Sequence, residues 1–195
     1  LPRDEQGLCL IAAPRRLEQS ETIVHELPAL LDSAMAHFDA IVANTGANWG
    51  EQHAVLLERS SRALFLVDQR ASSLRACKHA VELCARCGIA ASPFLFVANR
   101  CSKRSLFSSI DVSCAMQGAH AAELKDGGVE VEQALGTGLA YDLVSSRNAF
   151  AQSVRELMGE VVGEAAGSLA SSEESEAPSR GLFSFRRARR EGVLP

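Results

Sequence analysis

Aromatic residues are scarce in this sequence, and long apolar runs are missing from it. Phe, Trp and Tyr make up 5% of the 195 residues, whereas hydrophobic residues as a whole make up 47%. The core must therefore consist mainly of Leu, Val, Ile and Ala, a composition typical of a parallel sheet covered by helices. No segment reaches the roughly 18 consecutive apolar residues that a membrane-spanning helix needs. No leader of the secretory type is visible either, which predicts a cytoplasmic protein.

Positive charge is not in excess, and the motifs of several enzyme classes are missing. The net charge is −4, which argues against a protein that binds nucleic acid over its whole surface. No G-x-S-x-G motif is present, so a serine hydrolase of that type is not supported. The histidines show no metal-ligand spacing and are predicted to lie on the surface or in the core: His25, His37, His53, His79 and His120.

The six cysteines do not form a recognisable framework. They are scattered through predicted strands and helices, and a chain of this size needs no disulfides, so we expect reduced thiols. Cys84 and Cys87 form a CxxC pair on a predicted helix. Zinc needs about four ligands, and no second CxxC or paired His follows. The interpretation we favour for the pair is therefore the packing of small apolar side chains.

Short apolar runs alternate with helical patterns along residues 8–162. This alternation predicts right-handed βαβ units and an α/β fold with a mainly parallel sheet and helices on both faces. The expected strands are residues 8–13, 40–43, 63–67, 94–98 and 119–124. The expected helices include residues 51–58, 72–87, 105–114, 129–135 and 147–162, with a further helix interrupted or restarted at Pro28.

The composition changes after Gly163. Residues 165–179 are small, polar and acidic, which predicts a disordered linker, and residues 180–195 are basic. We therefore divide the chain into one folded domain, residues 1–163, and a disordered linker with a basic tail, residues 164–195.

Polar residues follow two of the predicted strands. Asn44, Thr45 and Gly46 come directly after residues 40–43, and Asn99 and Arg100 come after residues 94–98. The carboxyl ends of parallel strands are where α/β sheets place their ligands. A nucleoside triphosphatase usually has Asp at the position of Asn44, whereas an amide offers a hard cation no negative charge. The alternative is that Asn44 ends a strand and that Thr45 and Gly46 form an ordinary turn.

The order of these segments resembles the MinD/ParA deviant-Walker P-loop ATPases, and within them the CpaE/TadZ pilus-assembly branch. The resemblance covers residues 7–162. It is carried by the ordered set of segments GLCLIAAP (7–14), FDAIVANTG (38–46), LFLV (64–67), ASSLRACK (71–78) and LFVANR (95–100).

The resemblance implies ATP and Mg²⁺ as cofactors and a truncated P-loop NTPase fold of the SIMIBI type. The phosphate-binding P-loop would precede Leu1, and Asn44 would occupy the Walker-B-type position, so we assign no catalytic residue and expect weak or lost hydrolysis. Thr45 and Gly46 would form the second switch. Asn99 would read adenine and Arg100 would stack on it. Lys125 and Asp126 would line the other side of the base, mostly through their backbone.

The resemblance also implies a role in Flp/Tad pilus assembly or in the positioning of that machinery, as a homodimer. Trp49 and Gln52 would face the dimer partner. The alternatives are a chromosome- or plasmid-partitioning or septum-site ATPase, for which DNA binding is not expected here, and a non-enzymatic assembly scaffold.

The basic tail resembles the membrane-targeting helix of MinD-like proteins, which would place the protein at the inner face of the membrane. Its alternatives are an inert tail and a nucleic-acid contact. The residues that would contact the membrane are Leu182, Phe183, Phe185, Arg186, Arg187, Arg189 and Arg190.

Overall fold

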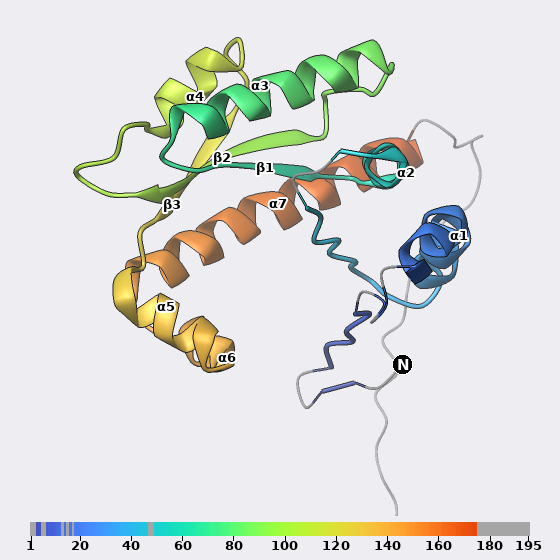
Figure 1. Cartoon of the computed structure of the whole chain (residues 1–195), viewed down its shortest axis with the longest axis horizontal. Coiled ribbons are helices and arrows are strands. Elements are labelled where there is room, and N and C mark those ends of the chain that lie inside the picture. The colour runs from blue at the N-terminus through green and yellow to red at the C-terminus, as the bar shows by residue number, and fades with distance from the viewer. Residues whose placement is uncertain are drawn as a thin grey trace, which may run out of the picture.

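The computed structural model describes residues 3–4, 7–12, 14, 16, 18–46 and 49–174 (Figure 1). The described strands are β1 (Ala63–Val67), β2 (Phe94–Cys101) and β3 (Ala121–Lys125). The described helices are α1 (Glu18–Met35), α2 (Glu51–Arg59), α3 (Ala71–Arg86), α4 (Ser109–Ala115), α5 (Gly128–Gly136), α6 (Ala140–Val144) and α7 (Ala149–Glu174). Within this part of the chain, no helix is long and apolar enough to cross a membrane.

The three strands form one parallel sheet in the order β1-β2-β3. Leu64 pairs with Leu95, and Leu66 pairs with Val97, so these four side chains share one face of the sheet. Phe65 and Phe96 are paired on the opposite face. Both faces of β2 are buried, which explains why its sequence is a continuous apolar run rather than an alternating one.

Helices cover both faces of the sheet, as the sequence predicts (Figure 1). α3 and α4 pack on one face around Phe96, Ala98 and Val112, whereas α7 packs on the other, where Leu157 contacts Leu95, Val97 and Leu124. Three phenylalanines lie together on the α3 side, where the ring of Phe65 lies 4.8 Å from that of Phe94 and 5.5 Å from that of Phe96. The expected α/β fold with helices on both faces is confirmed.

Two of the five predicted strands are wrong. Residues 8–12 and 40–43 run through the structure without strand pairing, apart from one isolated bridge between Arg3 and Cys9. Their apolar side chains are exposed, with 76% of Leu10 and 89% of Val42 accessible to solvent. A strand is stable only where a neighbour satisfies its backbone groups, and no described strand lies beside either segment.

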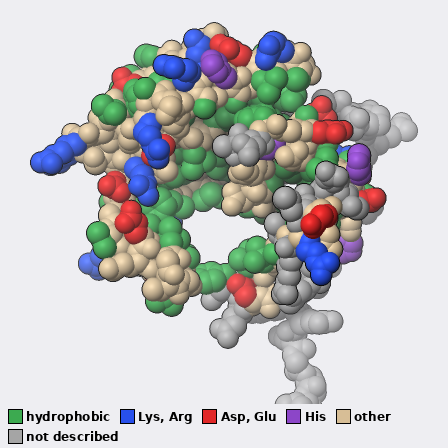
Figure 2. Space-filling view, viewed as in Figure 1, with side chains coloured by type: hydrophobic (Ala, Val, Ile, Leu, Met, Phe, Trp, Pro, Cys, Tyr) green, Lys and Arg blue, Asp and Glu red, His purple; other side chains and the backbone are tan. Residues whose placement is uncertain are grey.

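The sheet also ends at an uncovered strand. Among the described residues β1 pairs only with β2, so its outer edge has no strand partner. Leu64 and Leu66 are 39% and 55% exposed, although Leu95 and Val97 on the same face are buried. In Figure 2 an opening passes through the molecule, bordered in large part by hydrophobic side chains. This face of the described sheet is therefore less well covered at β1 than at β2.

Of the two alternatives at Pro28, the structure has one helix that continues through it. The helices differ from the prediction in two places, the first being α6, which was not predicted. α7 extends to Glu174, so residues 165–174 of the expected disordered linker are helical, because small residues such as Ala and Ser allow an established helix to continue. The tail residues 182–190 lie outside the described residues.

Candidate functional site

Four of the predicted site residues lie together at the carboxyl ends of β2 and β3. Cys101 pairs with Lys125, which places Asn99 and Arg100 at the end of β2 beside Lys125 and Asp126 at the end of β3. The N–H of Asp126 donates to the carbonyl oxygen of Cys101 at 3.0 Å, which holds the two strand ends together. This is the edge of a parallel sheet at which ligands bind in α/β proteins.

The end of β2 is irregular at Asn99 and Arg100. The pairing with β3 shifts between Ala98 and Cys101, and Arg100 has a φ of 55°, which is uncommon for a residue other than glycine. The Oδ1 atom of Asn99 accepts a hydrogen bond from the N–H of Arg100 at 3.0 Å. The chain therefore bulges at this point and turns the two side chains out of the strand pairing.

Gln69 holds this bulge from the end of the neighbouring strand. Its Nε2 donates to the carbonyl oxygen of Asn99 at 2.9 Å and to that of Phe107 at 3.1 Å, and its Oε1 accepts from the N–H of Phe107 at 2.9 Å. Gln69 was not among the predicted site residues. The signal that selected Asn99, a polar side chain just after an apolar strand, also applies to Gln69, which follows β1 by two residues.

Arg100 is exposed and only loosely held. Its Nη2 lies 3.6 Å from Oε1 of Glu132, and the two side chains are 61% and 66% exposed. Ion pairs of this kind contribute little to stability, so the guanidinium can be redirected at low cost. Arg100 can therefore leave Glu132 and contact a ligand at this edge with little loss of stability.

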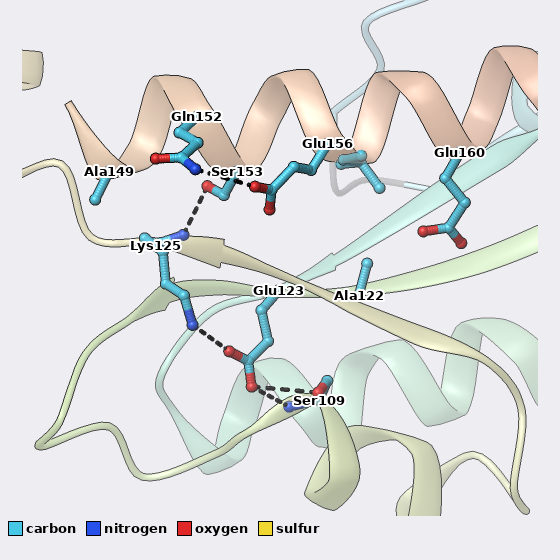
Figure 3. A pocket seen from close by; sticks show the side chains of 10 residues that line it. Ser109, Ala122, Glu123, Lys125, Ala149, Gln152, Ser153, Glu156 and Glu160 are labelled. Carbon is cyan, nitrogen blue, oxygen red and sulfur yellow. Dashed lines mark hydrogen bonds and ion pairs between the residues drawn. The ribbon is translucent and has the colours of Figure 1, made fainter. Parts of the chain in front are cut away.

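In Figure 3 the side chain of Lys125 points away from α7, toward Glu123 and Ser109, whereas its backbone N–H faces α7. Its Nζ lies 2.6 Å from Oε2 of Glu123, and this hydrogen bond lowers the pKa of Glu123 and raises that of Lys125. Its backbone N–H donates to Oγ of Ser153 at 3.0 Å. Oδ1 of Asp126 accepts from the N–H of Gly128 at 3.3 Å, at the start of α5. Both side chains therefore have structural partners, so a ligand at the strand ends would meet mainly their backbone.

The other three predicted site residues lie elsewhere. Asn44, Thr45 and Gly46 are exposed and do not end a strand. Within the described residues, no hydrogen bond or ion pair links them to Asn99, Arg100 or Asp126. The predicted convergence of the two polar segments on one cleft therefore has no support from these contacts.

The loop that contains Gly46 is attached to α2 through His53, whose Nε2 lies 3.0 Å from the carbonyl oxygen of Gly46. Trp49 stacks on the His53 ring, with centroids 5.0 Å apart, and is 38% exposed. Gln52 is half-buried. These positions leave part of Trp49 accessible to a partner, and its proposed dimer contact stays a prediction.

The CxxC pair is split between core and surface. Cys84 is buried in the cluster under α3, and Cys87 is exposed. Burial raises the pKa of the Cys84 thiol and raises that of Cys77 to about 11. Both thiols are therefore poor nucleophiles at neutral pH, because the thiolate is the reactive form.

The described residues fit one part of a magnesium nucleotide better than another. No group of three or more His, Cys, Asp or Glu side chains among them could hold a metal ion. The strand ends offer an amide, a guanidinium and backbone groups, which suit the edge and face of a planar base. The chemistry of these groups is therefore that of a base contact.

Comparisons with known proteins support the fold. No family model matches this chain, and no curated protein matches it. A solved structure, that of a ParA family ATPase from Chlorobium tepidum TLS, matches with a TM-score of 0.64 over 82% of this chain at 18% identity. The fold is ParA-like. This chain spans 63% of the length of that ATPase, so the similarity concerns a part of the larger structure. At this level of identity, the ParA-like fold carries no residue assignments by itself.

Proposed function

We propose that this chain is the base-binding part of a ParA-like, nucleotide-binding protein whose ligand is ATP. The observation that carries the proposal is the bulge at the carboxyl end of β2, where Asn99 and Arg100 leave the strand pairing and Gln69 holds the backbone. Site irregularities of this kind are common next to ligand sites.

Each residue of the site has a distinct role in this proposal. The amide of Asn99 provides a donor and an acceptor for the edge of adenine. The guanidinium of Arg100 stacks on the face of the base, where a cation over an aromatic ring is favourable. The backbone of Lys125 and Asp126 closes the other side. The triphosphate and Mg²⁺ would be held by the P-loop that the resemblance expects before Leu1.

Hydrolysis is weak or lost in this proposal. Asn44 stands where the resemblance expects an acid, and a neutral amide cannot provide the charge that directs a hard cation. Asn44, Thr45 and Gly46 then act as a loop that responds to the nucleotide rather than as part of the base site. The loop is bonded to α2 through His53.

The cellular role that we propose is Flp/Tad pilus assembly or the positioning of that machinery, by a nucleotide-dependent homodimer. The ordered motifs that resemble the CpaE/TadZ branch support this role. In the dimer, Trp49 and Gln52 contact the partner. The tail from Leu182 to Arg190 contacts anionic lipid at the inner face of the membrane, with two copies acting together.

The charges on the face shown in Figure 2 argue against a partitioning ATPase that binds DNA through that face. On the face shown in Figure 2, Lys and Arg side chains are interspersed with Asp and Glu rather than gathered in a basic patch. A DNA-binding surface needs clustered positive charge to release counterions. The remaining alternative is an assembly scaffold without nucleotide, which the following experiment separates from the proposal.

The test is a titration of a fluorescent ATP analogue against the 195-residue chain and against the polypeptide that the complete gene encodes. Arg100→Ala is expected to weaken binding about fivefold, the loss expected from one cation–π contact. Arg104→Ala is the matched control, because Arg104 is an exposed arginine in the adjacent turn. Equal effects of the two variants, or no binding by either polypeptide, would contradict the proposed site and favour the scaffold.

Asn44→Asp provides a separate test of the metal. If the amide is the reason for weak hydrolysis, this variant of the complete polypeptide gains a stronger dependence of analogue binding on Mg²⁺. The same dependence in the wild type and in Asn44→Asp would exclude Asn44 from the metal region, and it would leave the base site of Asn99 and Arg100 unaffected.

A further inference from the structure

His53 is a buried histidine whose two ring nitrogens both bind the loop before α2. Only 6% of the residue's surface is accessible to solvent. Nδ1 accepts a hydrogen bond from the N–H of Gly50 at 3.2 Å, and Nε2 lies 3.0 Å from the carbonyl oxygen of Gly46. A nitrogen that accepts from an N–H cannot carry a proton, so the proton lies on Nε2 and is donated to Gly46. The contacts therefore require the neutral ring in one tautomer.

The same ring connects the loop to the hydrophobic core. Trp49 stacks on His53 at an interplanar angle of 25°, and its other ring neighbour is Phe65 of β1, at 6.2 Å between centroids. Phe65 in turn contacts Phe94 and Phe96. The loop is thus held from two sides, by hydrogen bonds to α2 and by ring contacts to the sheet.

His53 is also the main attachment of the segment that precedes it. Within the described residues, the bond from His53 to Gly46 is the one hydrogen bond that ties residues 40–46 to another element. The apolar side chains Ile41 and Val42 are exposed and give the segment little packing. The hydrogen-bonded anchor of this segment is therefore the imidazole of His53, seven residues after Gly46.

We propose that His53 is a positioning residue that holds the Asn44–Gly46 loop, and that it does so only as the neutral imidazole. Its relevance to nucleotide binding rests on the proposed function, whereas its effect on the loop does not. A ring protonated on both nitrogens has no acceptor for the Gly50 N–H, and the two donors would then face each other. Protonation consequently releases Gly50 and loosens the loop.

The groups that face the His53 ring carry no charge of their own, so a pH-dependent change in the loop would come from the ring itself. Both ring nitrogens face backbone groups rather than charged side chains. β1 carries no charged residue, and the loop residues 44–50 carry none either. Among the described side chains, the charged or titratable ones on the two helices nearby are Glu51, Glu58 and Arg59 on α2, and Glu18, His25, Glu26 and Asp32 on α1. Arg59 and Asp32 pair with each other.

The chain contains a single tryptophan, Trp49, which makes the test direct. An imidazolium in contact with an indole quenches its fluorescence, so the emission of Trp49 in the 195-residue chain is expected to fall during an acid titration once the ring takes up a second proton. His53→Gln keeps one acceptor and one donor but does not titrate, so its profile is expected to be flat. His79→Gln, a change at an exposed histidine on α3, is the control and keeps the wild-type profile. A flat wild-type profile, or an unchanged profile in His53→Gln, would overturn the proposal.

Hydrogen exchange gives a second readout at pH 8. In His53→Leu the Gly50 amide loses its acceptor, and its exchange is expected to be at least about fivefold faster than in the wild type, the effect of one hydrogen bond. His53→Gln restores slow exchange if the bonds, rather than the ring volume, hold the loop. If the Gly50 amide exchanges as fast in His53→Gln as in His53→Leu, the positioning role is contradicted.

Titration of the His53 variants with the fluorescent ATP analogue distinguishes the role of His53 from the proposed function. If both are correct, His53→Leu weakens binding of the fluorescent ATP analogue by the complete polypeptide and His53→Gln does not. If the loop responds to His53 as expected but no variant binds the analogue, the positioning role stands on fluorescence and exchange, and the proposed function fails.

Discussion

The side-chain amide of Gln69 donates to the backbone oxygen of Asn99 at 2.9 Å, across 30 residues of sequence. The same amide exchanges two hydrogen bonds with the backbone of Phe107. One glutamine at the end of β1 therefore fixes the end of β2 and the loop that leads to α4. The bulge at Asn99 is therefore stabilised by a specific side chain that follows the neighbouring strand β1.

Replacing Gln69 should destabilise the protein without disturbing the sheet. Gln69→Ala leaves the carbonyl oxygens of Asn99 and Phe107 and the N–H of Phe107 without this partner, and we expect a loss of about 2 kcal/mol in the free energy of unfolding. Urea unfolding measures it. Gln133→Ala on the exposed face of α5 is the control, and an equal shift of the two midpoints would show that Gln69 has no special role.

Gly127 should not tolerate even a methyl group. A Cβ atom there would lie 2.2 Å from Cγ2 and 2.7 Å from Cβ of Val131, and 3.0 Å from Cβ of Phe150. Because the overlap involves Cβ atoms near the backbone, we expect Gly127→Ala to cost about 2 kcal/mol, as overpacking does. In Gly136→Ala the new Cβ meets nothing within 4 Å, so this variant is expected to be neutral or slightly stabilising. Thermal unfolding of the two variants checks the contrast, and equal melting temperatures would contradict it.

Leu157 should contribute far more to the free energy of unfolding than Met158, the next residue in the sequence. Leu157 is 6% exposed and packs α7 against Leu95, Val97 and Leu124, whereas Met158 is 40% exposed. We expect Leu157→Ala to lower the free energy of unfolding by about 3 kcal/mol and Met158→Ala by less than about 1 kcal/mol. Comparable urea midpoints for the two variants would mean that α7 is not docked on this face.

Acid should remove the stabilisation that the start of α4 provides. Asp111 accepts hydrogen bonds from the hydroxyl and the N–H of Ser108, which lower its pKa in the folded state. A lowered folded-state pKa means that the stabilisation is present above the unfolded value of about 3.9 and is lost as the pH falls through the folded value.

Asp111→Asn should therefore be less stable than the wild type at pH 7, and the difference should shrink below about pH 4. Urea unfolding at several pH values measures this. Asp142→Asn, at an exposed acid in the first turn of α6, controls for the helix dipole alone. A difference between Asp111→Asn and the wild type that is independent of pH would show that the carboxylate charge is not involved.

The resemblance led to seven candidate site residues. Four of them lie at the carboxyl ends of β2 and β3, and the other three lie in the segment before α2. Asn99, Arg100, Lys125 and Asp126 could be grouped in advance because parallel neighbouring strands end at the same edge. Asn44 could not be placed in the same way, because residues 40–43 form no strand in the described fold. Gln69 and His53 were missed as positioning groups because their roles depend on backbone atoms of other segments.

The sequence by itself determined the local order of this protein. Its apolar runs and helical patterns located all three observed strands and the helices between them, and their alternation required a parallel sheet with helices on both faces. Only the tertiary structure decided which apolar runs become strands. Residues 40–43 are as apolar as much of the sheet, yet a β-strand draws its stability from hydrogen bonds and packing supplied by neighbours, and local sequence does not encode whether those neighbours are present.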